Sequence, residues 1–325
     1  MKLNTLLVCS VLTVLGFPAA NAQSVWPNKA VKIIVAAAPG GSTDIFGRLI
    51  ALRLSEKFGQ PFVVENKSGG GGSIGAHAVL QSPADGYTLL MTADQLVAHA
   101  ALNIESPKMP YNPIKDFAPI SVVASGPLVL GVNSSFPAKS VGELVALVKA
   151  NPGKYAYSSC GHGTVNHLTG EMFNLAAGID LQHLAYKGCA PAILDAVSGQ
   201  APIFISVLPN AAPYEKNGKL RLLAVTSSQR LAAFPNVPTL TELGYQGFNV
   251  TPWFGLLAPG ATPKAIVMKL STEVAQAVGG TEFAGKIKSM YMETSSPTPE
   301  FFSELILTDY TRWSKVVREA KIKAD

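Results

Sequence analysis

The sequence has few cysteines, and neither they nor the histidines form a metal-binding or redox motif. Three cysteines occur in 325 residues without a CxxC pair, and the five histidines never form HExxH. A GxxxxGK[ST] phosphate loop and a GxSxG nucleophile elbow are also absent. These absences exclude the commonest zinc, redox and P-loop motifs, and they leave no metal site and no catalytic residue to predict.

Charged residues are also scarce, at 14% of the chain, with a formal net charge of +5. They are scattered, without a basic block and without basic residues interleaved with aromatic ones. This pattern excludes nucleic acid as the expected partner. A mild positive balance is compatible with a small acidic solute but does not require one.

Only the N-terminal segment reads as a targeting signal. Lys2 precedes an apolar stretch at residues 6–17, and Ala20-Asn-Ala22 is a small-x-small cleavage pattern. This predicts a secretory signal peptide over residues 1–22, cleaved after Ala22, because the apolar stretch is too short to span a membrane. The remaining 303 residues contain no clean apolar run of membrane length. We therefore expect a soluble, monomeric protein in the periplasm.

A strand followed by a glycine turn and a helix opens the exported part of the chain. The β-branched run at residues 31–35 predicts a buried strand, and Pro39-Gly-Gly41 ends it. Ser-Thr-Asp at residues 42–44 is a capping signal for a helix over residues 45–58. Such a turn presents free backbone N–H groups and the positive end of the helix dipole. It is either an ordinary connection or an anion site.

Two further strand-to-helix turns follow. A second strand at residues 61–66 leads into a glycine-rich loop at residues 67–75, and a third strand at residues 87–91 leads into Thr92-Ala-Asp94. The glycine-rich loop matches GxGxxG formally, but a run of four glycines satisfies that pattern by chance. We therefore expect no cofactor. Three such turns at the carboxyl edge of one parallel sheet are typical of a ligand-binding edge.

The second half of the chain predicts another α/β lobe. A strand region at residues 120–132 is interrupted at Ser-Gly-Pro 125–127, a candidate hinge, after which strand–helix units resume. The segment 249–257 is a second crossing, and the last helix starts at Thr298. We expect one lobe over residues 23–126 and 249–325, a second over 127–248, and a ligand cleft between them.

No arginine occurs between Asn133 and Leu220, so an arginine clamp cannot come from that part of the second lobe. A carboxylate bound there must be held by backbone amides and by hydroxyls such as those of Ser158, Ser159 and Thr164. Lys187 is the cation nearest to a strand-end turn in that region.

A series of short motifs resembles the Bug family, the periplasmic solute-binding receptors of tripartite tricarboxylate transporters, over essentially the whole exported chain. In chain order the motifs are Trp26-Pro, Val31-Lys-Ile-Ile-Val, Ala38-Pro-Gly-Gly-Ser-Thr-Asp, Gly59-Gln-Pro, Val64-Glu-Asn, Asp85-Gly-Tyr-Thr-Leu, Tyr111-Asn-Pro, Asp116-Phe, Tyr186-Lys-Gly, Leu223-Ala-Val-Thr-Ser, Pro235-Asn-Val-Pro-Thr and Trp253-Phe-Gly-Leu-Leu-Ala-Pro. The resemblance implies a type II periplasmic-binding-protein fold and a small carboxylate ligand that is delivered to the membrane components of such a transporter. It further implies that the loop 38–44 holds one carboxylate, partly through water, and that the turn 158–164 holds the other end of the ligand.

Together, the turns and the resemblance give a set of expected ligand-binding residues. They are Ala38, Pro39, Gly40, Gly41, Asp44, Ser73, Thr92, Asp94, Ser158, Ser159, Gly163, Thr164, Lys187 and Ser206.

Three positions depart from the family pattern, one serine and a pair of cysteines. Ser206 stands where many relatives carry an aspartate that could meet a ligand ammonium, so an amino-acid ligand is disfavoured. Cys160 and Cys189 stand where relatives usually have small residues. They are either two buried small side chains or a structural disulfide, and we predict the disulfide.

Two other functions are considered. A secreted hydrolase could pair Cys160 with His162 or His167, or Ser159 with His167, but no motif supplies an acid partner. A receptor that presents its ligand to a sensor is the other alternative, and the sequence does not separate it from a transport receptor.

Overall fold

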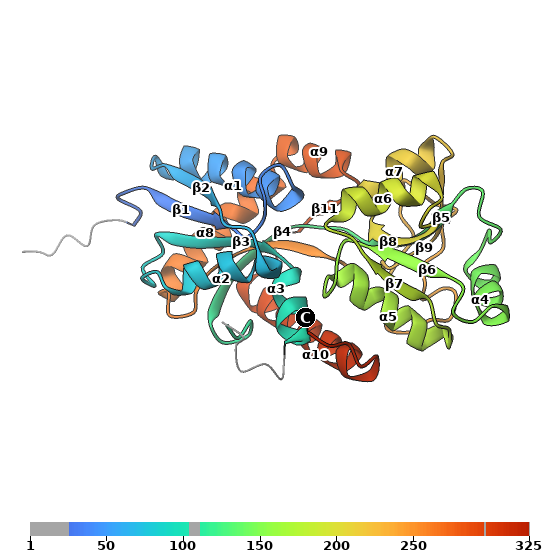
Figure 1. The fold of residues 1–325 in the computed structure, drawn as a ribbon. Coiled ribbons are helices and arrows are strands. Elements are labelled where there is room, and N and C mark those ends of the chain that lie inside the picture. Colours follow the sequence, from blue (N-terminus) through green and yellow to red (C-terminus); the bar gives the residue numbers. More distant parts are fainter. Residues whose placement is uncertain (1–25, 104–110, 296, 325) are drawn as a thin grey trace, which may run out of the picture.

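Two β-sheets, each with helices packed on it, form two lobes side by side (Figure 1). The structure is a computed structural model that describes residues 26–103, 111–295 and 297–324. The predicted signal peptide lies outside these residues. No helix in the described part of the chain combines the length and apolar character needed to cross a membrane.

The first lobe contains a six-stranded sheet with the order β11-β4-β10-β3-β1-β2. Its strands are β1 (Val31–Val35), β2 (Phe62–Asn66), β3 (Thr88–Ala93), β4 (Phe117–Ser125), β10 (Trp253–Pro259) and β11 (Glu293–Thr294). Its helices are α1 (Ser42–Phe58), α2 (Ser73–Leu80), α3 (Gln95–Leu102), α8 (Lys264–Gly279), α9 (Thr281–Ser289) and α10 (Pro299–Glu319), with a short 3-10 turn at Gly70–Gly72. Strands β2, β1 and β3 are parallel, as predicted.

The second lobe contains a five-stranded sheet with the order β7-β6-β8-β5-β9. Its strands are β5 (Leu128–Asn133), β6 (Ala156–Ser159), β7 (Gln182–Ala185), β8 (Ile203–Val207) and β9 (Leu220–Val225). Its helices are α4 (Val141–Ala150), α5 (Val165–Ala177), α6 (Cys189–Ser198) and α7 (Leu208–Lys216).

Strand β1 shows why these residues form a central strand. Its alternate side chains Val31, Ile33 and Val35 are fully buried in the core beneath α1, and Ile34 is buried in the core on the other face of the sheet. A strand buried on both faces is rich in β-branched residues, and in β1 the exposed Lys32 is the one exception among five residues. On α1, Phe46, Ile50 and Leu54 recur every four residues and are fully buried against this strand.

The chain passes between the lobes at two neighbouring places. β4 belongs to the first sheet and β5 to the second, with only Gly126-Pro127 between them. The Gly126 N–H donates to the carbonyl of Pro252 at 3.0 Å, beside the return crossing. Thr226 Oγ1 accepts the Leu128 N–H at 3.0 Å and donates to the Val250 carbonyl. The strand region predicted across residues 120–132 is therefore two strands in two sheets, because the glycine-proline pair lets the chain turn between them.

Candidate functional site

A cavity of about 440 Å³ lies where the two lobes face each other. It is lined by residues from both lobes: Gly41, Ser42, Thr43, Ala93, Asp94, Gln95, Cys160, Thr164, Val165, Asn166, Gly188, Cys189, Val207, Asn210, Pro252 and Phe254. We call this cavity the cleft.

Five helices begin at the cleft. The lining includes the first residues of α1 and α3 from the first lobe and of α5 and α6 from the second, and for α7 it includes the N-cap Val207 and Asn210 of the first turn. Each helix start presents N–H groups without intrahelical partners and a partial positive charge from the helix dipole. Since no Lys or Arg lines the cleft, these backbone groups are its source of positive potential. The arrangement suits an anion held by N–H donors.

The first-lobe side of the cleft starts at the glycine turn before α1. Gly40 has a φ of +83°, which favours glycine, and Gly41 is extended with φ −79° and ψ 169°. Helix α1 begins without a side-chain cap. The capping role predicted for residues 42–44 is therefore wrong, because the Asp44 carboxylate reaches back past the helix start to the Gly40 N–H, at 2.9 Å.

Asp44 is a buried ion-pair residue of the first lobe and does not line the cleft. Its carboxylate accepts from Arg48 Nε at 3.0 Å and from Asn66 Nδ2 at 2.8 Å, besides the Gly40 N–H. The hydrogen bond from Arg48, with those from Gly40 and Asn66, lowers the pKa of Asp44 to about 2. The Asp44 carboxylate thus holds the glycine turn in place, and its oxygen atoms already accept hydrogen bonds from these three donors.

The second-lobe side is built on the turn between β6 and α5. Thr164 caps α5: its Oγ1 donates to the Gly161 carbonyl at 2.7 Å and accepts from the His167 N–H at 3.4 Å. Asn166 follows on the first turn of α5 and donates to the carbonyl of Ile205 at 3.4 Å. The hydroxyl of Thr164 therefore both shapes this turn and lines the cleft.

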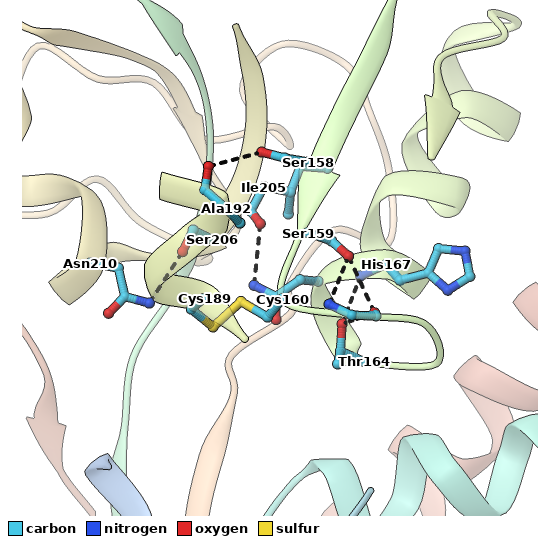
Figure 2. Close-up of a disulfide and its surroundings, with 12 residues drawn as sticks. Ser158, Ser159, Cys160, Thr164, His167, Cys189, Ala192, Ile205, Ser206 and Asn210 are labelled. Atoms are coloured by element: carbon cyan, nitrogen blue, oxygen red, sulfur yellow. Dashed lines mark hydrogen bonds between the residues drawn. A yellow bond between two sulfur atoms is a disulfide. The ribbon is translucent and has the colours of Figure 1, made fainter. Parts of the chain in front are cut away.

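A disulfide joins two of the cleft turns (Figure 2). Cys160 follows β6 and Cys189 begins α6, and their sulfur atoms are 1.97 Å apart. The Gly188 N–H also donates to the Cys160 carbonyl at 3.0 Å. Cys160 therefore has no thiol in this structure, which contradicts its proposed role as the nucleophile of a hydrolase.

The three serines predicted at the second-lobe strand ends, which Figure 2 labels near the disulfide, are not part of the cleft lining. Ser158 Oγ donates to the carbonyl of Ala192 at 3.5 Å, and Ser159 Oγ pairs with His183 Nε2 at 2.6 Å. Ser206 Oγ accepts from Asn210 Nδ2 at 3.3 Å. The Ser159 hydroxyl contacts His183 and not His167, so the Ser159–His167 pair drawn for a hydrolase is not formed.

Three of the predicted ligand-binding residues line the cleft: Gly41, Asp94 and Thr164. The others do not: Ala38, Pro39, Gly40, Asp44, Ser73, Thr92, Ser158, Ser159, Gly163, Lys187 and Ser206. Gly163 instead lies against Leu102 of α3, and the Lys187 side chain is exposed to solvent.

Several lining residues were not predicted, notably Ser42, Gln95, Asn166, Asn210 and Phe254. The first four lie in the first turns of α1, α3, α5 and α7, where the strand–turn–helix pattern could have placed them. Phe254 lies at the start of β10, and no local sequence pattern marks it as a cleft residue.

Histidines support the second-lobe turn from behind. The rings of His167 and His183 stack with centroids 3.8 Å apart, and His167 Nδ1 accepts the Gly163 N–H at 3.1 Å. Burial, with the neighbouring histidines, lowers the pKa of His167 to about 3 and that of His183 to about 4. In the described residues, no group of three or more His, Cys, Asp and Glu is placed to hold a metal ion.

This stack predicts loss of stability in acid. The unfolded chain protonates His167 and His183 near pH 6.5, whereas the folded protein keeps both neutral to about pH 4. Lowered pKa values of this kind make the free energy of unfolding fall as the pH falls from 6.5 toward 4, by up to about 1.4 kcal/mol per pH unit for each histidine.

Thermal unfolding between pH 7 and pH 4.5 measures this effect. The control is the double variant His167→Asn, His183→Gln, which keeps polar atoms near the imidazole nitrogens but does not titrate. We expect the melting temperature of the variant to fall less steeply than that of the parent chain. Equal slopes would show that the histidines do not carry the pH dependence.

The two sheets, the paired crossings and the cleft between them define the class of the protein: a two-lobed solute-binding protein with the type II periplasmic-binding-protein fold. The family model of the tripartite tricarboxylate transporter family receptor matches residues 46–322, and the chain belongs to that family. The protein BugT of Bordetella pertussis is 36% identical over 310 residues, which cover 95% of each chain.

Two solved structures of relatives carry bound acids. The chain is similar to Rpa4515 of R. palustris with adipate, with 35% identity, a TM-score of 0.81, and coverage of 92% of this chain and 99% of that one. It is also similar to MatC of Rhodopseudomonas palustris with bound malate, with 30% identity, a TM-score of 0.78, and coverage of 90% and 100%.

Proposed function

We propose that this protein captures a small organic carboxylate between its lobes, outside the cytoplasm, and delivers it to the membrane components of a tripartite tricarboxylate-type transporter. The observation that carries the proposal is the convergence of five helix N-termini on one cleft that has no lining cation. Charge-assisted hydrogen bonds contribute about 1.5–3 kcal/mol each. Four or five of them, less the cost of ordering, give about −8 kcal/mol, a micromolar affinity.

The division into lobes supports capture by closure. We assign residues 23–126 and 249–325 to the first lobe and residues 127–248 to the second, with the hinge at the two crossings beside Gly126 and Thr226. The first crossing consists of Gly126 and Pro127 alone, and the hydrogen bond from the Gly126 N–H to the Pro252 carbonyl places the second crossing beside it. A rotation of one lobe against the other therefore needs changes in few dihedral angles. A signal peptide cleaved after Ala22 would deliver the protein to the periplasm.

The ligand class follows from the lining and from the relatives. Relatives bind adipate and malate. Five helix N-termini favour an anion in the cleft, and Ser206, which lies outside the lining with its hydroxyl held by Asn210, adds no negative charge for a ligand ammonium. We therefore expect a mono- or dicarboxylate without an ammonium group.

A thermal-shift screen of organic acids, including adipate and malate, against amino acids and amines tests this ligand class. Ligand at a hundredfold excess over Kd stabilises the folded protein by about 2.7 kcal/mol, which raises the melting temperature by several degrees. We expect acids without an amino group to give such shifts. If only cationic or zwitterionic amines did so, the proposed ligand class would be wrong.

A sensor receptor is the alternative, since its cleft would have the same chemistry. Uptake of the labelled acid by cells with and without the receptor separates the two functions. Delivery to a transporter requires uptake to fall when the receptor is removed, whereas a sensor would change gene expression and leave the transporter working.

A further inference from the structure

The cleft contains one ionisable side chain, and it is an acid. Asp94 is the N-cap residue of α3 and is 8% exposed, and every other residue of the cleft lining is neutral. A receptor for carboxylates therefore places a carboxyl group of its own beside an anionic ligand. If both were ionised, the ligand charge would face a like charge on a buried side chain, at a high cost in free energy.

No cation compensates Asp94 within the described residues. Asp94 has no salt bridge there, and its side chain does not cap α3, so the N–H of Gln95 is the one hydrogen-bond donor that favours its ionised form in the described residues. The charge that acts on it is that of Asp309 of α10, which has the same sign. Arg312 is engaged with Asp309 at 3.2 Å, and Trp253 Nε1 donates to the same carboxylate at 3.0 Å. The one cation of this cluster is therefore used by Asp309.

The other elements around Asp94 bring no charge toward it. Phe254 of β10 and Pro252, just before that strand, belong to the lining, and the second lobe contributes the disulfide, Thr164 and Asn166. On α3 the next titratable side chain is His99, which lies against Gly71. His167 of the second lobe points away from the disulfide (Figure 2). Burial, and then the charge of Asp309, raises the pKa of Asp94, and these effects outweigh the N–H of Gln95 that favours the ionised form.

We propose that Asp94 carries its proton in the closed cleft and donates a hydrogen bond to a carboxylate oxygen of the ligand, so that the receptor captures the acid anion together with a proton. This inference rests on the proposed function. The helix N-termini favour an anion in the cleft, and the ligand carboxylate is that anion. The proton enters from solvent when an ionised Asp94 is enclosed, remains on the Asp94 oxygen in the complex, and returns to solvent when the lobes open.

The pH dependence has a definite sign. Below the pKa of Asp94 in the open receptor, the group is already protonated and affinity is constant. Above it, each binding event must take up one proton, so affinity falls tenfold per pH unit. Asp94→Asn keeps the shape of the protonated acid and a hydrogen-bond donor but does not titrate.

Isothermal calorimetry with adipate and malate between about pH 6.5 and 9, where these acids are fully ionised, tests the inference. The wild-type chain, Asp94→Asn and Asp94→Ala are compared, and the matched control is Asp180→Asn, which removes an exposed acid outside the cleft. Titrations in two buffers of different ionisation enthalpy count the protons that are taken up.

We expect wild type and Asp180→Asn to lose affinity as the pH rises and to take up about one proton per ligand at high pH. Asp94→Asn should bind with constant affinity and no proton uptake, more tightly than wild type at pH 9, and Asp94→Ala should bind more weakly than Asp94→Asn.

Each of the other outcomes overturns the inference in a different way. Acid binding that is independent of pH in wild type and equally strong in Asp94→Ala would refute the role of Asp94 and leave the proposed function standing. Tighter binding at high pH that is lost in Asp94→Asn would show that the ionised form of Asp94 favours binding, which is the opposite of the inference. If no organic acid of the screen were bound at any pH, the proposed function and this inference would both fall.

Discussion

Replacing Gly41 with valine is expected to abolish ligand binding and to leave the fold intact. Gly41 lies directly before α1 with φ −79° and ψ 169°, a conformation that β-branched residues adopt readily. An added Cβ meets only the Ala38 carbonyl oxygen, at 3.8 Å, so the side chain has room within the protein. Because Gly41 lines the cleft, the valine would stand where the ligand must approach the N–H groups of α1. A loss of more than a hundredfold in affinity, about 2.7 kcal/mol, is expected.

Calorimetry with the acid identified by the thermal-shift screen measures this loss, and circular dichroism checks the fold. The matched control is Gly285→Val on α9, an exposed glycine whose added Cβ meets nothing within 4 Å. It should bind like wild type. Undiminished affinity in Gly41→Val would place the binding site away from this turn.

Strand and helix positions around the cleft were predictable because they depend on local patterns. The β-branched run of β1, the glycine turn and the helical spacing of α1 lie within thirty residues of one another, and the structure has them where the sequence indicates. The three parallel strands and the passage between the lobes near Gly126 also follow from such signals.

The orientation of individual side chains was not predictable in the same way. Consecutive strand residues point to opposite faces of a sheet, so a serine at a strand end can lie on either face. Ser158 and Ser206 are not part of the lining, and Asn210, on the helix after Ser206, takes the place at the cleft. The role of Asp44 depends on Asn66, which is 22 residues away in the sequence. Phe254 reaches the cleft because β10 pairs between β3 and β4, a long-range pairing without a local signal.

Removing the disulfide is expected to cost both stability and affinity. Cys160 and Cys189 are separated by 29 residues, and closing a loop of that size stabilises a folded chain by about 3–4 kcal/mol in the chain-entropy model. The bond also ties the β6–α5 turn to the start of α6, and both turns line the cleft. The double variant Cys160→Ser, Cys189→Ser should therefore unfold at lower denaturant concentration and bind the ligand more weakly, because two of the helix starts are no longer held together.

Thiol titration of the denatured, unreduced exported protein provides the chemical test, and it should find no free thiol. Dithiothreitol should lower the denaturation midpoint of wild type to that of the serine variant and leave the midpoint of the variant unchanged. This comparison separates the loss of the disulfide from any effect of serine in place of cysteine. Two free thiols in the exported protein would contradict the disulfide. If the bond were present but its removal left the denaturation midpoint unchanged, its expected contribution to stability would be wrong. The disulfide constrains the unfolded chain, so this contribution does not depend on whether the ligand is present.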